Sequence, residues 1–437
     1  MERVLHTDVS SHAGETITIT GWLHKKRLLG GLNFLSVRDR SGVTQILVEK
    51  GDEIEKLRGL QIGTILSITG TVVPDERAPG GAELHDVTLD VQVPVLEESP
   101  IEIDKPLSHK PEHLDTLFEN RVLGLRNLQE RAVFEIQALI TRTVRAYLDE
   151  LSFTEIRTPK LLAEATEGGA EVFKLDYFGK TATLAQSPQF YKQMMVGVFE
   201  RVYEIAPVYR AEPSATTRHM TEYISIDAEL GFIDLADLRT LLSGLLNRVV
   251  NDVWSSYEPE LKRWNATRPL LAEEIPVISM AEIHERYTKA TGTSTIGEKD
   301  LRPDEERWIC DYTKKNLGSE AVFVSEWPAS EMKFYHKKNE QNGEIADRVD
   351  LLFRGVEITT GSMRENRYDI VVDQLQALAH GDPSDAGFAP LLGAMKYGMP
   401  PHGGFGMGLE RLTQKILGFN NVKEASLFPR DINRLTP

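Results

Sequence analysis

The sequence predicts an α+β protein in which a small β-domain is followed by a larger domain of mixed strands and helices. Three observations support this fold class. Short apolar or alternating segments, separated by glycine-containing turns, recur at roughly ten-residue spacing through residues 1–100. Four prolines then stand among charged residues and indicate a linker, which we assign to 101–125. Over 126–437 a helical period of apolar residues is followed by further strands and helices.

The first domain is expected to be a small barrel or sandwich, because short strands at regular spacing are typical of these architectures. The clearest candidate strands are residues 16–22, 34–38, 43–48 and 64–69. The second domain should begin with a long amphipathic helix. Six apolar residues recur there at helical spacing, namely Val133, Ile136, Ile140, Val144, Tyr147 and Leu151.

Composition and charge exclude several classes of protein. The chain has 437 residues and a formal net charge of −16, which argues against a general nucleic-acid coat protein but allows a local basic patch. No apolar run is long enough to span a membrane, and no secretory signal is expected because the N-terminus lacks a basic flank followed by an apolar stretch. The single cysteine, Cys310, excludes intrachain disulfides and fits a reducing cytoplasm.

Two candidate strands, 201–210 and 222–230, carry polar residues on one face. A strand period of two places Tyr223, Asp227 and Glu229 on the same side of the second strand, with apolar residues on the opposite side. The plain interpretation is the solvated face of an antiparallel hairpin. Further segments with polar and glycine-rich patterns favour a binding site instead.

A second hairpin is predicted around a two-residue turn at Arg354 and Gly355. In that register Asp350 faces Thr359 and lies diagonally across from Glu357, at roughly 7–8 Å between Cα atoms. Two carboxylates at this separation can share a hard cation such as Mg²⁺, which prefers oxygen ligands. The alternative is a pair of unrelated surface acids.

Two segments combine a helix start with groups that suit small ligands. In residues 404–412, glycines at every second position precede a helix that carries Arg411. The glycines let a ligand approach the backbone closely, and the planar guanidinium of Arg411 suits a phosphate. Residues 187–188 are a serine and a proline, a good N-cap and first helical position. Gln189 and Lys192 then share one face of that helix and could hold a small polar ligand.

Taken in order along the chain, these segments resemble the signature motifs of class II aminoacyl-tRNA synthetases. The helix and strand ending at Pro159 resemble motif 1, the hairpin around Arg210 resembles motif 2, and the segment ending at Arg411 resembles motif 3. Segments 187–192 and 361–364 resemble the aspartyl-tRNA synthetases in particular. Only about 170 residues separate motifs 2 and 3, which is similar to the short archaeal and eukaryotic form without a large inserted domain.

The resemblance implies an OB-fold barrel that binds the anticodon and a catalytic domain built on an antiparallel sheet flanked by helices. Phe34 would stack on an anticodon base and Gln45 would hydrogen-bond base edges. The implied substrates are L-aspartate, ATP and tRNA-Asp, with Mg²⁺ as the metal. Aspartate attacks the α-phosphorus of ATP to give aspartyl-adenylate and pyrophosphate, and the aspartyl group then moves to the tRNA. Motif 1 implies a homodimer.

The resemblance also assigns roles to single residues. Catalytic roles fall on Arg210 and Arg411, and the metal would be held by Asp350 and Glu357. The aspartate-binding residues would be Glu167, Gln189, Lys192, Asp227 and Arg364. The ATP-binding residues would be Arg210, Glu212, Arg218, His219, Tyr223, Glu357 and Arg411.

Three other readings remain open from the sequence. They are an asparaginyl-tRNA synthetase, an amide-forming ligase on the same catalytic fold, and a non-catalytic OB-fold RNA-binding protein. A further hypothesis is that tRNA-Asn is also charged with aspartate, which would require a partner amidotransferase. The two anticodons differ only in the third letter, and the candidate discriminating residues, His24 and 74–81, offer few base-specific donors.

Overall fold

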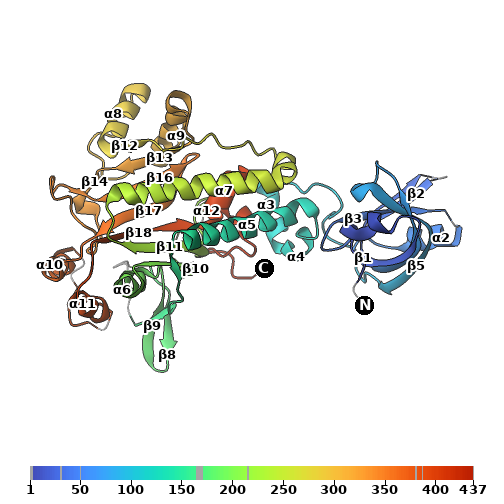
Figure 1. The fold of residues 1–437 in the computed structure, drawn as a ribbon, viewed down its shortest axis with the longest axis horizontal. Helices are drawn as coiled ribbons and strands as arrows, with labels where there is room; N and C mark the ends of the chain where they lie inside the picture. Colours follow the sequence, from blue (N-terminus) through green and yellow to red (C-terminus); the bar gives the residue numbers. More distant parts are fainter. Residues whose placement is uncertain are drawn as a thin grey trace. The chain divides into compact units, whose positions relative to one another are not determined.

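The structure is a computed structural model that describes residues 3–29, 32–49, 51–163, 171–213, 216–378, 381–385 and 387–436. The chain divides into two compact units, Met1–Arg131 and Ala132–Pro437 (Figure 1). The predicted α+β class is confirmed, because the first unit contains a β-barrel and the second a sheet flanked by helices. Among the described residues, no helix is long and apolar enough to cross a membrane.

The first unit is organised around a closed five-stranded barrel with strand order β1-β2-β3-β5-β4. Its interior follows from alternation: Leu66, Ile68 and Val72 point inward from one strand and are almost completely buried. The bounds of the barrel elements are α1 His6–Val9, η1 Ser10–His12, β1 Thr16–Leu29, β2 Leu32–Arg38, β3 Val43–Val48, α2 Gly51–Gly59, β4 Ile65–Pro74, η2 Pro79–Gly81 and β5 Ala82–Val93.

The segment expected to be a linker, 101–125, contains two helices, α3 (Pro111–Glu119) and α4 (Arg121–Gly124). Pro111 stands at the start of α3, where its missing N–H removes no hydrogen bond. Leu114, Leu117 and Phe118 of α3 are buried, so apolar packing holds this helix in place.

The second unit is built on an eight-stranded sheet with strand order β12-β13-β16-β17-β18-β11-β10-β6. Neighbouring strands are antiparallel through the middle of the sheet, while the pairs β12–β13 and β10–β6 at the two edges are parallel. The bounds are β6 Thr154–Glu155, β10 Arg201–Tyr209, β11 Glu222–Gly231, β12 Val277–Ser279, β13 Ala321–Ser325, β16 Arg348–Phe353, β17 Val356–Arg364 and β18 His402–Gly408.

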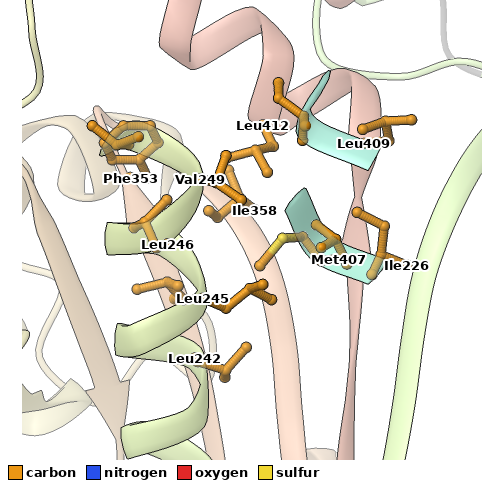
Figure 2. Packing of buried hydrophobic residues seen from close by; sticks show 14 of the residues in the cluster. Ile226, Leu242, Leu245, Leu246, Val249, Phe353, Ile358, Met407, Leu409 and Leu412 are labelled. Carbon is orange, nitrogen blue, oxygen red and sulfur yellow. The ribbon is translucent and has the colours of Figure 1, made fainter. Parts of the chain in front are cut away.

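One face of this sheet packs against the helices α5 (Leu128–Glu150), α7 (Leu235–Arg263) and α12 (Leu409–Leu417). The predicted long amphipathic helix is confirmed as α5. Figure 2 shows the apolar stripe of α7, in which residues three and four apart point at β11, β17 and β18. The buried residues labelled there are Ile226, Leu242, Leu245, Leu246, Val249, Phe353, Ile358, Met407, Leu409 and Leu412.

The opposite face carries α6 (Gln189–Phe199) over β10 and β11, and the helix pair α8 (Met280–Thr291) and α9 (Pro303–Leu317) over β13 and β16. The polar cavity described below lies on this face. The remaining elements are β7 Leu161–Leu162, β8 Lys174–Tyr177, β9 Lys180–Leu184, β14 Trp327–Pro328, η3 Ala329–Glu331, β15 Ile345–Ala346, α10 Tyr368–Leu378, α11 Ala389–Met395 and η4 Val422–Ala425.

Candidate active site

A cavity of about 280 Å³ opens on the sheet face that α5 and α7 leave uncovered. It gathers residues from β11, β16, β17 and β18, from the starts of α6 and α12, and from the segment between β10 and β11. The predicted site residues that line it are Gln189, Lys192, Arg210, Glu212, Arg218, His219, Tyr223, Asp227, Glu357, Arg364 and Arg411. Asp350 is buried beside Arg348 and is not part of the cavity wall. Glu167 lies outside the described residues.

Strand alternation and glycines make room for the charged floor of the cavity. On β11, Asp227 and Glu229 point to the cavity face, while the alternate residues enter the core behind the sheet. The facing residues on β18 are Gly406 and Gly404. A Cβ at Gly404 would lie 2.1 Å from Glu229 Oε2, so no larger residue fits there without displacing that carboxylate.

Four charges form a closed network at the floor. Lys192 Nζ lies 2.9 Å from Asp227 Oδ1 and 3.5 Å from Glu229 Oε2, and it donates a third bond to the carbonyl of Phe405. Arg364 donates to both oxygens of Glu229, from Nε at 2.7 Å and from Nη2 at 3.2 Å. Burial alone would raise the pKa of Glu229, but Arg364 and Lys192 outweigh it and keep that pKa below its ordinary value.

At the other end, an aromatic ring and several cations surround an open space. The Arg210 guanidinium lies 5.7 Å from the centre of the Tyr223 ring, and Arg210 Nη1 lies 3.5 Å from Glu212 Oε1. His219 Nε2 lies 3.7 Å from the other oxygen of Glu212. Burial lowers the pKa of His219, and Arg411 lowers it further while Glu212 opposes the shift. This end therefore attracts anions, and its aromatic face suits a flat ring.

Arg411 and Arg218 are joined through the backbone. Arg411 Nη1 donates to the carbonyl of Glu357 at 2.9 Å, and its Nη2 donates to the carbonyl of Arg218 at 3.4 Å. Arg218 in turn donates from Nη2 to the carboxylate of Glu306 on α9 and to the carbonyl of Gly355. Both arginines therefore have fixed positions before any ligand binds.

The hairpin β16–β17 differs from the predicted register in one respect. The turn at Arg354 and Gly355 is present, with positive φ at both residues, and Glu357 faces Leu352 as expected. The predicted pairing of Asp350 with Thr359 is wrong. A bulge at Ile358 moves the partner of Asp350 to Thr360.

The bulge keeps the two carboxylates on one face, with the Thr360 hydroxyl donating to Glu357 at 3.0 Å. Both oxygens of Asp350 accept from Arg348, at 3.1 Å and 2.6 Å. Burial raises the pKa of Asp350 to about 7; Arg348 opposes the rise and the charge of Glu357 adds to it. Burial would also raise the pKa of Glu357, but Arg411 and Arg348 outweigh it and hold that pKa below its usual range.

Some lining residues were missed from the sequence. Tyr335 lies under Arg364, with the guanidinium 5.5 Å from the ring centre, and His336 is buried beside it. No local pattern marks these two positions. Arg348 could have been found, because it stands two residues before Asp350 on the same strand face. Two buried amide atoms in the wall, Gln189 Nε2 and Gln186 Oε1, have no hydrogen-bond partner among the described residues. Gln189 Nε2 can donate a hydrogen bond to a ligand, and Gln186 Oε1 can accept one.

The two candidate anticodon residues lie on the outer face of the barrel. Phe34 is half-buried and stands outside the barrel core, opposite Arg27 on β1. Gln45 donates from Nε2 to Glu83 Oε2 at 2.7 Å. An aromatic ring beside a basic and an amide side chain is the combination that binds single-stranded bases.

The chain thus combines a closed β-barrel with a second domain whose sheet carries a charged cavity. The family model "tRNA synthetases class II (D, K and N)" matches residues 113–432, and the model "OB-fold nucleic acid binding domain" matches residues 17–97. The chain therefore belongs to the class II aminoacyl-tRNA synthetases, which use ATP.

The chain is also similar over its full length to curated relatives. The chain is 43% identical to the aspartate–tRNA(Asp/Asn) ligase of Thermus thermophilus, over 100% of both chains. It is 40% identical to the enzyme of the same name from Deinococcus radiodurans, over 100% of this chain and 99% of that one. Among solved structures, asparaginyl-tRNA synthetase from Pyrococcus horikoshii with asparaginyl-adenylate aligns over 100% of both chains, with TM-score 0.90 and 30% identity.

Proposed function

We propose that this protein is an aspartate–tRNA ligase that charges both tRNA-Asp and tRNA-Asn with aspartate. The observation that carries the proposal is the buried four-charge floor, in which Lys192 and Arg364 accompany Asp227 and Glu229. The names of the full-length relatives support the same reaction. The α-carboxylate of L-aspartate attacks the α-phosphorus of ATP and releases pyrophosphate. A ribose hydroxyl at the 3′ end of the tRNA then attacks the acyl carbon of the adenylate, which forms the aspartyl ester and releases AMP.

The floor can exchange partners when aspartate binds. The substrate ammonium takes the place of Lys192 beside Asp227. The ammonium group of Lys192, released from Asp227, then pairs with the substrate side-chain carboxylate together with Arg364. Each charge keeps a partner during this exchange, which matters because an unpaired buried charge costs several kcal/mol. Asparagine carries a neutral amide in place of the carboxylate, so it leaves Lys192 and Arg364 with the single carboxylate of Glu229 between them and is rejected. Gln189 supplies a further amide to the bound amino acid, and Glu167 is assigned to the same subsite from sequence alone.

The nucleotide occupies the cationic end. Tyr223 stacks on the adenine and Glu212 contacts its edge, while Arg210 holds the α-phosphate. Arg218, His219 and Arg411 hold the distal phosphates. The first step has little acid–base chemistry, so Arg210 and Arg411 act as the catalytic residues by positioning the reacting groups and by stabilising the charge that develops on the phosphate oxygens.

The carboxylate pair fits Mg²⁺ by the chemistry of its oxygen donors. The raised pKa of Asp350 is caused first by its burial, and the adjacent charge of Glu357 adds to it; a divalent cation would relieve that repulsion. Glu357 lines the cavity and would be the direct ligand, with Asp350 behind it. A bound ion would neutralise charge on the phosphate oxygens.

The competing function is asparagine activation on the same fold. It is separated from aspartate activation by ATP–pyrophosphate exchange with each of the twenty amino acids. We expect exchange with aspartate alone; exchange that depends on asparagine would reject the proposal. The enzyme is further proposed to act as a homodimer formed through α5 and β6. Product made on tRNA-Asn would be completed by an amidotransferase.

A further inference from the structure

We infer that Glu306, on the helix pair α8–α9, is a positioning residue for ATP: it holds Arg218 so that the free edge of the guanidinium meets the distal phosphates. The inference rests on the proposed function, in which Arg218 faces those phosphates. It gives a role in the reaction to residues 280–317, a segment between motifs 2 and 3 that holds none of the site residues predicted from the sequence.

One side of the Arg218 guanidinium is bonded to the protein, and the other side is available to a ligand. Within the described part of the chain, both hydrogen bonds of the guanidinium come from Nη2, one to the Glu306 carboxylate and one to the carbonyl of Gly355. Nε and the two Nη1 protons are left for a ligand, and Arg218 lines the cavity. A phosphate can therefore bind Arg218 without displacing Glu306.

Glu306 also compensates charge. Arg218, Arg411 and Arg210 converge on one end of the cavity and repel one another before ATP arrives. The side chain of Glu306 is 13% exposed and that of Arg218 is 23% exposed, so their attraction is only partly screened. Without the carboxylate, Arg218 would lose its fixed direction and could turn toward solvent.

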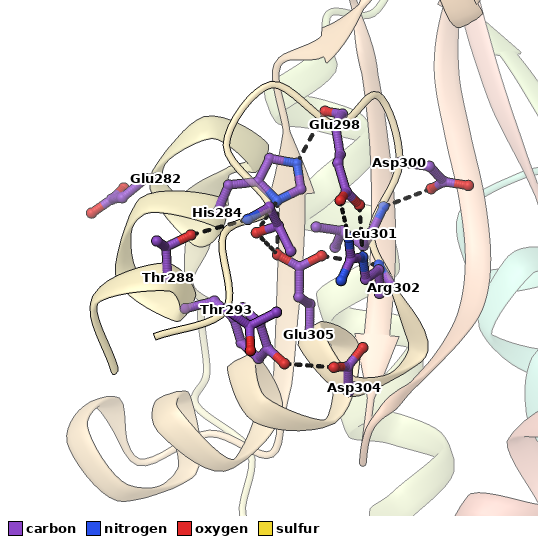
Figure 3. Close-up of polar contacts among 12 residues, drawn as sticks. Glu282, His284, Thr288, Thr293, Glu298, Asp300, Leu301, Arg302, Asp304 and Glu305 are labelled. Atoms are coloured by element: carbon purple, nitrogen blue, oxygen red, sulfur yellow. Dashed lines mark hydrogen bonds and ion pairs between the residues drawn. The ribbon is translucent and has the colours of Figure 1, made fainter. Parts of the chain in front are cut away.

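The position of Glu306 is fixed by its neighbour in the sequence. Glu305 is completely buried and accepts hydrogen bonds from the Thr295 hydroxyl at 2.6 Å and from the backbone N–H of Arg302 at 3.0 Å, and it lies 2.8 Å from His284 Nδ1 (Figure 3). These contacts tie the start of α9 to α8 and to the loop between them. The first turn of α9, which carries Glu306, is therefore anchored and not free to move.

The hairpin turn completes the support from the other side. Arg354 and Gly355 have φ of 49° and 78°, a backbone form that aims the Gly355 carbonyl at Arg218. A Cβ at Gly355 would lie 2.9 Å from Arg307 Cγ, so the turn and α9 are in close contact. Arg218 is thus held between two elements that already touch each other.

The experiment compares Glu306→Gln with Glu306→Asp and with Glu282→Gln as a matched control. Glu282 makes an ion pair with Arg286 on α8, away from the cavity. We expect Glu306→Gln to raise KM for ATP about tenfold and to change KM for aspartate less than about twofold. AMP, which lacks the distal phosphates, should bind the variant as it binds the wild type. Glu306→Asp should recover most of the loss, and Glu282→Gln should behave as wild type.

A double variant tests whether Glu306 acts through Arg218. In an Arg218→Ala background, Glu306→Gln should add less than about twofold to KM for ATP. Independent, multiplying effects would overturn the inference, and so would an unchanged KM for ATP in Glu306→Gln or an equal loss of ATP and AMP binding. Calorimetric binding of ATP and AMP gives the same comparison without turnover. Absence of aspartate-dependent exchange in the wild type would reject the proposed function and leave this binding test intact.

Discussion

Lys192 on α6 and Asp227 on β11 form a buried ion pair, with Nζ and Oδ1 2.9 Å apart and both side chains at most 3% exposed. The pair stands against a second one, Arg364 with Glu229, so the floor of the cavity is neutral before substrate binds. The four floor residues are all charged, but their net charge is zero. They can therefore exchange partners with aspartate, which carries one ammonium group and two carboxylates.

Lys192→Ala should reduce aspartate activation at least about a thousandfold, because the substrate carboxylate loses its cation and Asp227 loses its partner. Binding of ATP should change less than about twofold. Pyrophosphate exchange and nucleotide calorimetry measure the two effects. Lys160→Ala is the control, since it breaks an ion pair with Glu204 outside the cavity and should leave aspartate activation near wild type. Unchanged aspartate kinetics in Lys192→Ala would refute the assignment.

Glu357→Gln should abolish adenylate formation while leaving the fold intact, because the neutral amide is a poor ligand for Mg²⁺ and cannot offset the charge of Arg411. The measurement is formation of aspartyl-adenylate in a single turnover across a range of Mg²⁺ concentrations. Glu344→Gln, at an exposed position, should show normal rates. Adenylate made at the wild-type rate by Glu357→Gln would show that the carboxylate pair does not hold the metal.

Glu410 should make stability depend on pH. Its carboxylate accepts the backbone N–H of Ile224, and burial raises its pKa to about 7 from an ordinary 4.5. The folded protein therefore binds this proton more tightly than the unfolded chain. Its contribution is complete below about pH 4.5 and is lost as pH rises to about 7, a change of about 3 kcal/mol. Thermal unfolding from pH 5 to pH 8 should show a steeper decline for wild type than for Glu410→Gln; parallel curves would contradict this account.

Many of the cavity residues could be predicted from local sequence patterns, and the others could not. Strand period alone places Tyr223 and Asp227 on one face, and the alternating glycines of β18 mark where side chains need room. The bulge at Ile358 has no local signal, because a two-residue turn is compatible with a regular register beyond it. The pairing of Arg218 with Glu306 joins residues 88 apart in the sequence, a distance over which periodicity carries no information.

The helices in 101–125 also depend on contacts that have no local sequence signal. The cluster of prolines predicts a linker, yet Pro111 stands at the first position of α3, where proline is favoured. What stabilises α3 is burial of apolar residues such as Leu117 and Phe118. This stabilisation comes from tertiary packing, and it outweighs the tendency of the flanking prolines to prevent helix formation.

The protein is predicted to be a homodimer. The strand β6 lies at one edge of the eight-stranded sheet and pairs on one side only among the described strands, with β10, so its other edge is open to a second copy. Sedimentation equilibrium should give about twice the chain mass of 49.1 kDa. A single species at the chain mass, at micromolar concentration, would contradict the prediction.

The barrel should recognise tRNA-Asp and tRNA-Asn in the same way. Phe34 and Gln45 can account for an anticodon letter that tRNA-Asp and tRNA-Asn share, so Phe34→Ala should weaken aspartylation of both by a similar factor.

Discrimination at the third letter needs a directed donor, and the segment 74–81 offers one basic side chain, Arg77. The edge of its guanidinium formed by Nε and Nη2 is paired with Asp75, at 3.0 Å and 2.9 Å, so fewer donors remain to read a base. Purified enzyme should therefore aspartylate the two transcripts with efficiencies within about tenfold of each other. A preference for tRNA-Asp of about a thousandfold, roughly 4 kcal/mol, would reject relaxed specificity and leave an enzyme that is strict for tRNA-Asp.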